Sequence, residues 1–488
     1  LPASWENDQV FLRLEKVASA SFVWVNGQAI GYNEGAQEPA EYNITKYLKP
    51  GEKNTLAVRL ENLPESSRWY PGAGLYRNVH LIVTEDAYIP VWGTYITTPS
   101  VNEKFAKVNV LTKVVLPEGA DPAKYSVETS VWNPNKQKLT AVRTSLAQMK
   151  YNNDQAEQEF VIQDPSLWSP EMPALYSAET RLYEGDKLKD VYTTPFGIRS
   201  IEIIPDKGFF LNGKRTVFKG VCNHHDLGPL GAAVNDAAIR RQIRILKDMG
   251  CNAIRTSHNM PAPELIRACD EMGMMIMAES FDEWNVAKCK NGYNLLFDEW
   301  AEKDLVNLLH NFRNNPSVVM WCIGNEVPNQ WNEGDTKIAK WLQDICHRED
   351  PTRPVTQGMD APDAVVNNNF AAVMDVAGFN YRPFKYKVNY KKLPQRIVLG
   401  SETASTVSSR GVYKFPVERK AMAKYDDHQA SSYDVEHCGW SNLPEDDFIQ
   451  HEDLPYCIGE FVWTGFDYLG EPTPYYTCLL YTSPSPRD

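Results

Sequence analysis

The sequence has few of the features that mark disulfide-rich, membrane-spanning or nucleic-acid-binding proteins. It has nine cysteines, none before Cys222 and no two in a Cys-x-x-Cys pair, so we expect buried thiols rather than a zinc site or a disulfide framework. No run of about 18 apolar residues is present, so we expect no membrane-spanning helix. The net charge is −13, from 50 Lys and Arg against 63 Asp and Glu. Without a basic patch to offset it, we expect no nucleic-acid partner.

The two ends of the chain also lack ordinary boundary signals. Leu1 leads into a strand-rich region without a leader peptide, so the residues do not indicate a compartment. Residues 478–488 share no pattern with the preceding sequence and resemble the translation of a sequencing adaptor, so we expect a non-native tail. We therefore expect the natural sequence to continue beyond residue 477, with a helix that covers the last strand of the third domain.

The first 200 residues consist of short, closely spaced segments with the alternating apolar pattern of half-buried strands. Val10–Leu14 and Ser21–Val25 are examples, and a turn at Asn26-Gly27 follows the second. The pattern predicts one β-sandwich over residues 1–85 and a second, immunoglobulin-like sandwich over residues 86–200. A chain of 488 residues is too long for one hydrophobic core, and about three domains are expected.

From residue 201 to residue 477, apolar strand-like runs alternate with amphipathic helices. Ile239, Ile243 and Leu246, for example, lie on one helical face that is closed by Gly250. Such an alternation implies a parallel sheet, and eight repeats of it imply a (β/α)8 barrel. The expected strands span residues 217–222, 251–256, 274–279, 318–323, 354–358, 375–380, 397–401 and 457–463.

Residues capable of catalysis or sugar binding follow seven of these eight strands. In (β/α)8 barrels the carboxyl ends of the strands form the active face. A single histidine there is more often a packing residue, but the same placement at seven strands favours one shared site. The candidates are His224, Arg255, His258, Glu279, Asn325, Glu326, Tyr381, Glu402 and Trp463.

Short motifs stand at these strand ends in a fixed order. The most distinctive is Val319-Met-Trp-Cys-Ile-Gly-Asn-Glu326. The others are Asn252–His258, Phe379–Tyr381, Gly400–Glu402 and Phe461–Gly465, with Trp24–Gly27 and Gly72–Arg77 in the first domain. Together they resemble glycoside hydrolase family 2, the family of β-galactosidases, β-glucuronidases and β-mannosidases. The resemblance implies that residues 1–85 are part of a sugar-binding jelly roll.

The resemblance also implies a retaining exo-β-glycosidase, which needs a proton donor and a carboxylate facing the anomeric carbon. We expect Glu326 to be the acid/base, with a raised pKa, and Glu402 to be the nucleophile, kept ionised. Arg255 and Tyr381 are placed to favour the charged form of Glu402. The fourth and seventh strands lie across the barrel mouth from each other, so we expect carboxyl groups about 5–5.5 Å apart.

Four further residues are expected to contact the sugar. Asn325 suits a hydrogen bond to the 2-hydroxyl, which strengthens at the transition state. His224 and His258 are expected to bind other hydroxyls, and Trp463 to form the floor of the subsite. The substrate is then an oligo- or polysaccharide.

Two positions depart from the family pattern. Family β-galactosidases can hold Mg²⁺ near the acid/base through a glutamate and a histidine two positions later. Glu283 fits the glutamate, but Asn285 stands in place of the histidine, so we expect no cofactor beyond a weakly bound hydrated Mg²⁺. Arg68 stands about where relatives often carry an aspartate, and it is either a surface charge or a contact to an anionic or branched sugar.

The sequence leaves several readings open. A β-galactosidase is favoured, because Gly459–Pro474 resembles members with that activity. The alternatives are a β-glucuronidase and, in another class, a non-catalytic carbohydrate-binding protein, against which the intact Glu326 and Glu402 argue. The sequence is compatible with a homo-oligomer, and only analogy favours a periplasmic or secreted location.

Overall fold

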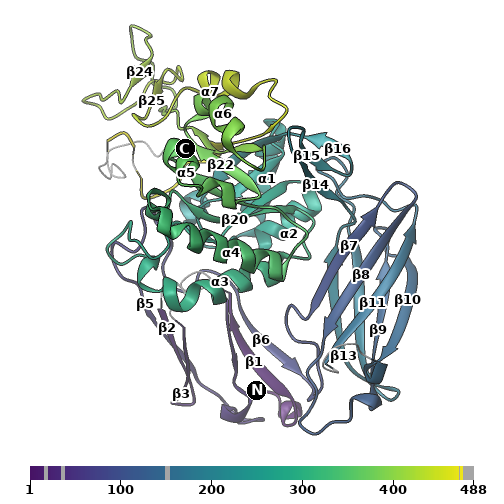
Figure 1. The fold of residues 1–488 in the computed structure, drawn as a ribbon. Coiled ribbons are helices and arrows are strands. Elements are labelled where there is room, and N and C mark those ends of the chain that lie inside the picture. Colours follow the sequence, from purple (N-terminus) through teal and green to yellow (C-terminus); the bar gives the residue numbers. More distant parts are fainter. Residues whose placement is uncertain (16–19, 34–38, 149–153, 472, 476–488) are drawn as a thin grey trace.

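A computed structural model describes residues 1–15, 20–33, 39–148, 154–471 and 473–475. Figure 1 shows two β-rich units, coloured purple and blue, which lie beside a barrel that carries the rest of the chain. The expectation of a non-native tail at residues 478–488 lies outside the described residues.

The first unit contains two three-stranded sheets, with strand orders β4-β1-β6 and β3-β2-β5. Alternate residues of the strands point inward, and Leu12, Leu14 and Val23 are fully buried between the sheets. The strands are β1 Gln9–Leu14, β2 Ala20–Val25, β3 Gln28–Asn33, β4 Ala40–Asn43, β5 Leu56–Glu61 and β6 Val79–Thr84.

The second unit is a sandwich of a four-stranded sheet, β10-β9-β12-β13, and a three-stranded sheet, β11-β8-β7. In β8, Ala106, Val108 and Val110 are buried and alternate with more exposed residues, as the sequence pattern predicts. The strands are β7 Thr94–Val101, β8 Phe105–Lys113, β9 Tyr125–Trp132, β10 Lys138–Ser145, β11 Gln155–Gln163, β12 Tyr176–Glu184 and β13 Lys187–Phe196.

A small sheet follows, and then a closed parallel barrel. The small sheet contains β14 Ile201–Ile204, β15 Gly208–Leu211 and β16 Lys214–Thr216. The barrel closes because β26 pairs with both β17 and β23. Its strands are β17 Phe218–Asn223, β18 Ala253–Thr256, β19 Met275–Glu279, β20 Val318–Asn325, β21 Val355–Met359, β22 Val376–Asn380, β23 Val398–Ala404 and β26 Cys457–Trp463. All eight expected strands are therefore confirmed, and so is the fold class of sandwiches joined to a (β/α)8 barrel.

Helices cover the outside of the barrel (Figure 1). They are α1 Asp236–Asp248, α2 Pro263–Met272, α3 Phe297–Phe312, α4 Thr336–Glu349, α5 Pro362–Asn367, α6 Tyr386–Asn389 and α7 Pro444–His451. Between β23 and β26 the chain makes a long excursion over residues 405–456, which contains α7 and the short strands β24 Lys420–Ala421 and β25 Glu436–His437. No described helix is both long and apolar enough to cross a membrane.

The segment between β5 and β6 joins the first unit to the carboxyl-end face of the barrel. Arg77 donates hydrogen bonds to the carbonyl oxygens of Pro261 (3.1 Å) and Met260 (2.9 Å), which follow β18. The backbone N–H of Tyr70 donates to the carbonyl of Leu469 (2.9 Å), which follows β26. The first unit therefore lies against the face where the candidate site was expected.

Candidate active site

The carboxyl ends of the barrel strands surround a cavity of about 660 Å³. Six of the residues predicted from the sequence line it, namely Arg68, His258, Glu326, Tyr381, Glu402 and Trp463. The other five are buried and do not line it, namely Arg255, Glu279, Asn325, His224 and Glu283.

Glu402 is held from both sides by charged or polar donors. It lies within β23, and its Oε2 accepts a hydrogen bond from Arg255 Nη1 at 2.8 Å. The Tyr381 hydroxyl donates to its Oε1. Tyr381 has φ +55°, a left-handed conformation that is uncommon outside glycine and often found at functional sites. Both contacts expected from the sequence are therefore present.

Burial dominates the pKa values of the two carboxyl groups. Burial, followed by the negative charge of Glu326, raises the pKa of Glu402 to about 8, although Arg255 and Tyr381 both lower it. Burial also raises the pKa of Glu326, and the charge of Asp360 adds to the rise. Arg255 and Tyr381 thus act on the pKa of Glu402 in the expected direction, against the larger effects of burial and of the charge of Glu326. The charge of one group opposes the ionisation of the other, so the two carboxyl groups titrate together.

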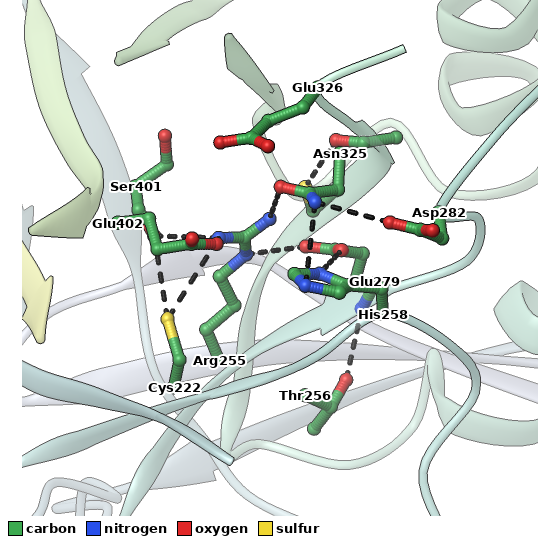
Figure 2. Close-up of polar contacts among 12 residues, drawn as sticks. Cys222, Arg255, Thr256, His258, Glu279, Asp282, Asn325, Glu326, Ser401 and Glu402 are labelled. Carbon is green, nitrogen blue, oxygen red and sulfur yellow. Dashed lines mark hydrogen bonds and ion pairs between the residues drawn. The ribbon is translucent and has the colours of Figure 1, made fainter. Parts of the chain in front are cut away.

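Glu326 follows β20 and points into the same cavity. Its φ is +43°, and its backbone N–H donates to the Gly358 carbonyl at 2.7 Å. Its Oε1 accepts a hydrogen bond from the amide of Asn380 at 3.0 Å. Figure 2 shows the Glu326 carboxyl group on the far side of the Arg255 guanidinium from Cys222, facing the same space as Glu402.

Arg255 organises the residues beneath this space (Figure 2). Its guanidinium donates to Glu279, to the Ser401 carbonyl (2.9 Å), to Glu402 and to Asn325 Oδ1 (2.8 Å). Because its side chain is fully buried and does not line the cavity, Arg255 acts on Glu402, the role expected from the sequence, and does not contact the substrate directly.

His258 and Asn325 belong to the same network. The Nδ1–H of His258 donates to Glu279 Oε1 at 2.7 Å, and burial lowers the pKa of His258 well below its usual range, so the ring is neutral. Its Nε2 therefore accepts, and the nearest donor is Asn325 Nδ2 at 3.4 Å. Asn325 Nδ2 also donates to Asp282 Oδ1 at 3.2 Å. The expected contact of Asn325 with a sugar hydroxyl stays a prediction.

Aromatic rings form one wall of the cavity. The ring of Trp463 stacks on that of His258, with centroids 5.2 Å apart and planes 4° from parallel. His224 packs against Trp69 (4.5 Å) and Tyr468 (4.3 Å), and neither of its ring nitrogens has a hydrogen-bond partner among the described residues. The expected contact of His224 with a sugar hydroxyl stays a prediction.

Arg68 reaches the cavity from the first unit. Its guanidinium forms two hydrogen bonds with the Asp282 carboxylate (2.7 and 3.0 Å) and a third with Glu471 (3.3 Å). It is therefore not a free surface charge, and its capacity to bind an anionic sugar is already used by protein carboxylates.

The residues around Glu283 do not fit a divalent ion. Its Oε2 accepts hydrogen bonds from the backbone N–H groups of Lys288 and Cys289, and its Oε1 accepts from that of Asn294. The side-chain oxygen of Asn285 accepts from Asn329 at 2.8 Å. Mg²⁺ needs oxygen atoms without such donors. Within the described ranges, no group of three or more His, Cys, Asp or Glu side chains could hold a metal. The prediction that Glu283 belongs to the site is therefore corrected: its carboxylate holds the loop after β19 together through three backbone hydrogen bonds.

Sequence reasoning missed several residues of the cavity. Asp360 lines it directly after β21, and the rule that strand ends carry the site could have found it. Asn380 was part of a recognised motif, but its contact with Glu326 was not foreseen. Tyr468 and Glu471 follow β26 in a segment with no periodic signal, and Trp440 lies in the excursion after β23.

Comparison with known families agrees with this arrangement. The sequence model described as "Glycosyl hydrolases family 2, TIM barrel domain" matches residues 202–479, more than half of the chain. The chain belongs to glycoside hydrolase family 2. Two further models of family 2 match as well, one described as "Glycosyl hydrolases family 2" over residues 88–199 and one as its sugar binding domain over residues 1–85.

Relatives within family 2 carry different activities in their names. The chain is 37% identical to Beta-galactosidase BoGH2A of Bacteroides ovatus, over 95% of the chain and 59% of that protein. It is 28% identical to Beta-glucuronidase of Bacteroides fragilis, over 95% of the chain and 68% of that protein. The crystal structure of a beta-glycosidase from Bacteroides vulgatus superposes with a TM-score of 0.85 at 31% identity, covering 97% of the chain and 62% of that structure. The chain thus spans about three fifths of the first and third of these relatives.

Proposed function

We propose that this family 2 chain is the catalytic part of a retaining exo-β-glycosidase that releases terminal β-D-galactosyl residues. The observation that carries the proposal is the pair of glutamates at the cavity. Glu326 and Glu402 come from β20 and β23 and line the same cavity, and Glu402 is held by a guanidinium and a phenol. A non-catalytic sugar-binding protein has no need of two carboxyl groups placed in this way.

The reactive form carries its proton on Glu326. Glu402 accepts hydrogen bonds from Arg255 and Tyr381, whereas Glu326 accepts one from the neutral amide of Asn380. A charge-assisted hydrogen bond stabilises the carboxylate more than a neutral one does, so the negative charge is better accommodated on Glu402.

The reaction then takes two steps. Glu402 attacks the anomeric carbon while Glu326 protonates the departing glycosidic oxygen, which leaves a covalent glycosyl-enzyme and an ionised Glu326. Glu326 next removes a proton from water as the water attacks the same carbon, and Glu402 is released. Trp463 on the cavity wall limits the access of bulk water to the sugar.

The charges around the cavity favour a neutral sugar. Five carboxyl groups and two guanidinium groups line it, namely those of Glu326, Asp360, Glu402, Asp467 and Glu471 with Arg68 and Arg382. Arg68 is paired with Asp282 and Glu471, and Arg382 Nη1 donates to the backbone carbonyls of Tyr381 and Trp440. A glucuronide carboxylate would meet mainly negative charge there. This supports a galactoside over a glucuronide, in line with the activity in the name of the Bacteroides ovatus relative.

A pair of mechanism-based probes tests both the nucleophile and the sugar. A 2-fluoro-β-galactosyl fluoride should label Glu402, found by peptide mapping, at least tenfold faster than its glucuronyl counterpart. Glu402→Gln should take no label and should lose several orders of magnitude in kcat with its circular dichroism unchanged. Label on Glu279 or Glu283 would overturn the assignment of the nucleophile. Faster labelling by the glucuronyl probe would overturn the choice of sugar.

A further inference from the structure

A lysine ammonium group lies against the peptide bond that precedes Glu326. Lys288 Nζ donates to the carbonyl oxygen of Asn325 at 2.7 Å and to Asp282 Oδ1 at 2.9 Å. Its side chain is only 11% exposed. The positive charge is therefore held in one place, where water screens it little.

The backbone of Lys288 is fixed as firmly as its side chain. Its N–H is one of the three backbone donors that meet the Glu283 carboxylate. Gly292 packs on the same carboxylate, and a Cβ at this position would come within 1.9 Å of Glu283 Oε1. The loop that follows β19 therefore wraps around the Glu283 carboxylate. This conformation places the Lys288 side chain against the end of β20.

A second cation stabilises the arrangement from the first unit. The Asp282 carboxylate that accepts from Lys288 also accepts two hydrogen bonds from Arg68, and the N–H of Asn291 on the same loop donates to the Glu65 carbonyl at 3.0 Å. Paired charges in this buried setting hold a fixed geometry, because moving either one would leave the other without its partner.

We propose that the Lys288 ammonium is the cation that positions the acid/base Glu326 in this chain, in place of a divalent metal ion. Lys288 does not line the cavity, so it is a positioning residue that acts through the Asn325–Glu326 backbone. The proposal rests on the proposed function, because it takes Glu326 as the proton donor.

The charge of Lys288 also affects the pH at which Glu326 loses its proton. Burial and the charge of Asp360 raise the pKa of Glu326, and Lys288, Arg68 and the hydrogen bond from Asn380 lower it. Without Lys288 the pKa of Glu326 rises, so the acid stays protonated to higher pH. A merely structural lysine would not move the pH profile in this direction.

The test compares Lys288→Met with Lys288→Arg, which keeps the charge, and with Lys290→Met as a matched control. Lys290 is two residues away on the same loop, is 77% exposed and lies 3.9 Å from Glu65. Lys288→Met should lower kcat/KM about tenfold or more for alkyl glycosides, which need a proton donor, and less than about threefold for dinitrophenyl glycosides. In Lys288→Met, the decrease of kcat/KM on the alkaline side of the pH profile should occur at a higher pH than in the wild type. In Lys288→Arg, this decrease should lie close to the pH found for the wild type. Lys290→Met should have the same pH profile as the wild type.

Magnesium alone provides a readout apart from activity. Isothermal titration of the wild-type protein with MgCl2 should show no binding heat up to millimolar concentration, and a chelator should change activity less than about threefold. Stoichiometric Mg²⁺ binding would overturn the proposal, as would a Lys288→Met profile identical to that of Lys290→Met. Should Lys288→Met melt well below the wild type, Lys288→Gln, which keeps a donor but no charge, takes its place.

A Glu326→Ala variant separates the proposed role of Glu326 as acid/base from the positioning role of Lys288. It should lose activity mainly on alkyl glycosides, and azide should restore turnover on activated ones with a β-glycosyl azide as product. If Glu326→Ala does not discriminate between the leaving groups, the proposed function fails. If Glu326→Ala behaves as expected and Lys288→Met does not, only the role of Lys288 fails.

Discussion

Glu326 and Glu402 occupy the same cavity but have different neighbours. Glu402 has a guanidinium and a phenol within hydrogen-bond distance, and Glu326 has an amide, with Asp360 nearby on the next strand end. Asp360 thus acts on Glu326 in the direction opposite to Lys288, because its negative charge raises the pKa of Glu326 and the charge of Lys288 lowers it. Beyond the dominant effect of burial, the pKa of the acid therefore depends on opposing charges at residues that take no part in the two chemical steps.

Removing the charge of Asp360 should shift the pH dependence toward acid. In Asp360→Asn the pKa of Glu326 falls, so Glu326 loses its proton at a lower pH and the alkaline limb of kcat/KM moves to lower pH. The hydrogen bond from Gln330 to Asp360 Oδ1 can be kept by the asparagine oxygen, so the fold should be unchanged. Asp363→Asn is the control, since Asp363 is 60% exposed and pairs with Lys385 on the surface. A limb that stays in place or moves to higher pH would contradict this account.

Regular elements and irregular segments differ in how far the sequence predicts them. The eight barrel strands could be located to within a few residues, because parallel strands covered on both faces read as continuous apolar runs. The position of Glu326 directly after such a run made it a candidate, and the resemblance of its motif to family 2 indicated its role. The excursion over residues 405–456 could not be foreseen, because β24 and β25 have two residues each and no detectable period. Lys288 was also missed, because it lies in an irregular loop without a periodic pattern. Its position depends on the Glu283 side chain folding back onto that loop.

The glycines that follow α1 and α2 allow a test of how tightly the helix ends are packed. α2 is capped at its C-terminus by Gly273, whose φ is +75° and where a Cβ would meet the Pro170 carbonyl oxygen at 2.2 Å. α1 is followed by Gly250, whose φ is +98° and where a Cβ would meet nothing within 4 Å. Gly250→Ala should cost about 1 kcal/mol from the backbone conformation alone, and Gly273→Ala about 1–3 kcal/mol more from the clash.

The two alanine variants are to be compared by their thermal unfolding midpoints under the same conditions. Activity on an aryl glycoside serves as the check that the site is intact in both. Equal midpoints would mean that the second unit, which carries Pro170, yields to the added methyl group.

The whole molecule is held together by contacts that also build the site. The first unit supplies Arg68 to the cavity wall and Arg77 to the backbone after β18. The second unit ends at Arg199, which donates to the carbonyls of Pro316 and Val318 at the start of β20. The strand that carries Glu326 is therefore fixed at one end by the second unit and at the other by a loop that the first unit touches.

Loosening the first unit should impair both stability and catalysis. Arg77 is 6% exposed, and Arg77→Met removes its hydrogen bonds to Met260 and Pro261, at a cost of about 2–3 kcal/mol. The first unfolding midpoint should fall, and kcat/KM should fall with it because Arg68 lies on the same segment. Arg59→Met, at a 67% exposed side chain of the same unit, should change the midpoint little. Full activity in Arg77→Met would show that the segment holds its place without this anchor.

The ion pair between Arg68 and Asp282 limits which first domains can be combined with this barrel by recombination. A recombination that replaced residues 1–85 with a segment lacking a cation at the position of Arg68 would leave Asp282 with Lys288 as its one remaining cation of the two. The descendant would fold a complete barrel and still have the charge beside its proton donor altered. The first 85 residues and the loop after β19 therefore depend on each other through one ion pair, although 214 positions separate Arg68 from Asp282 along the chain.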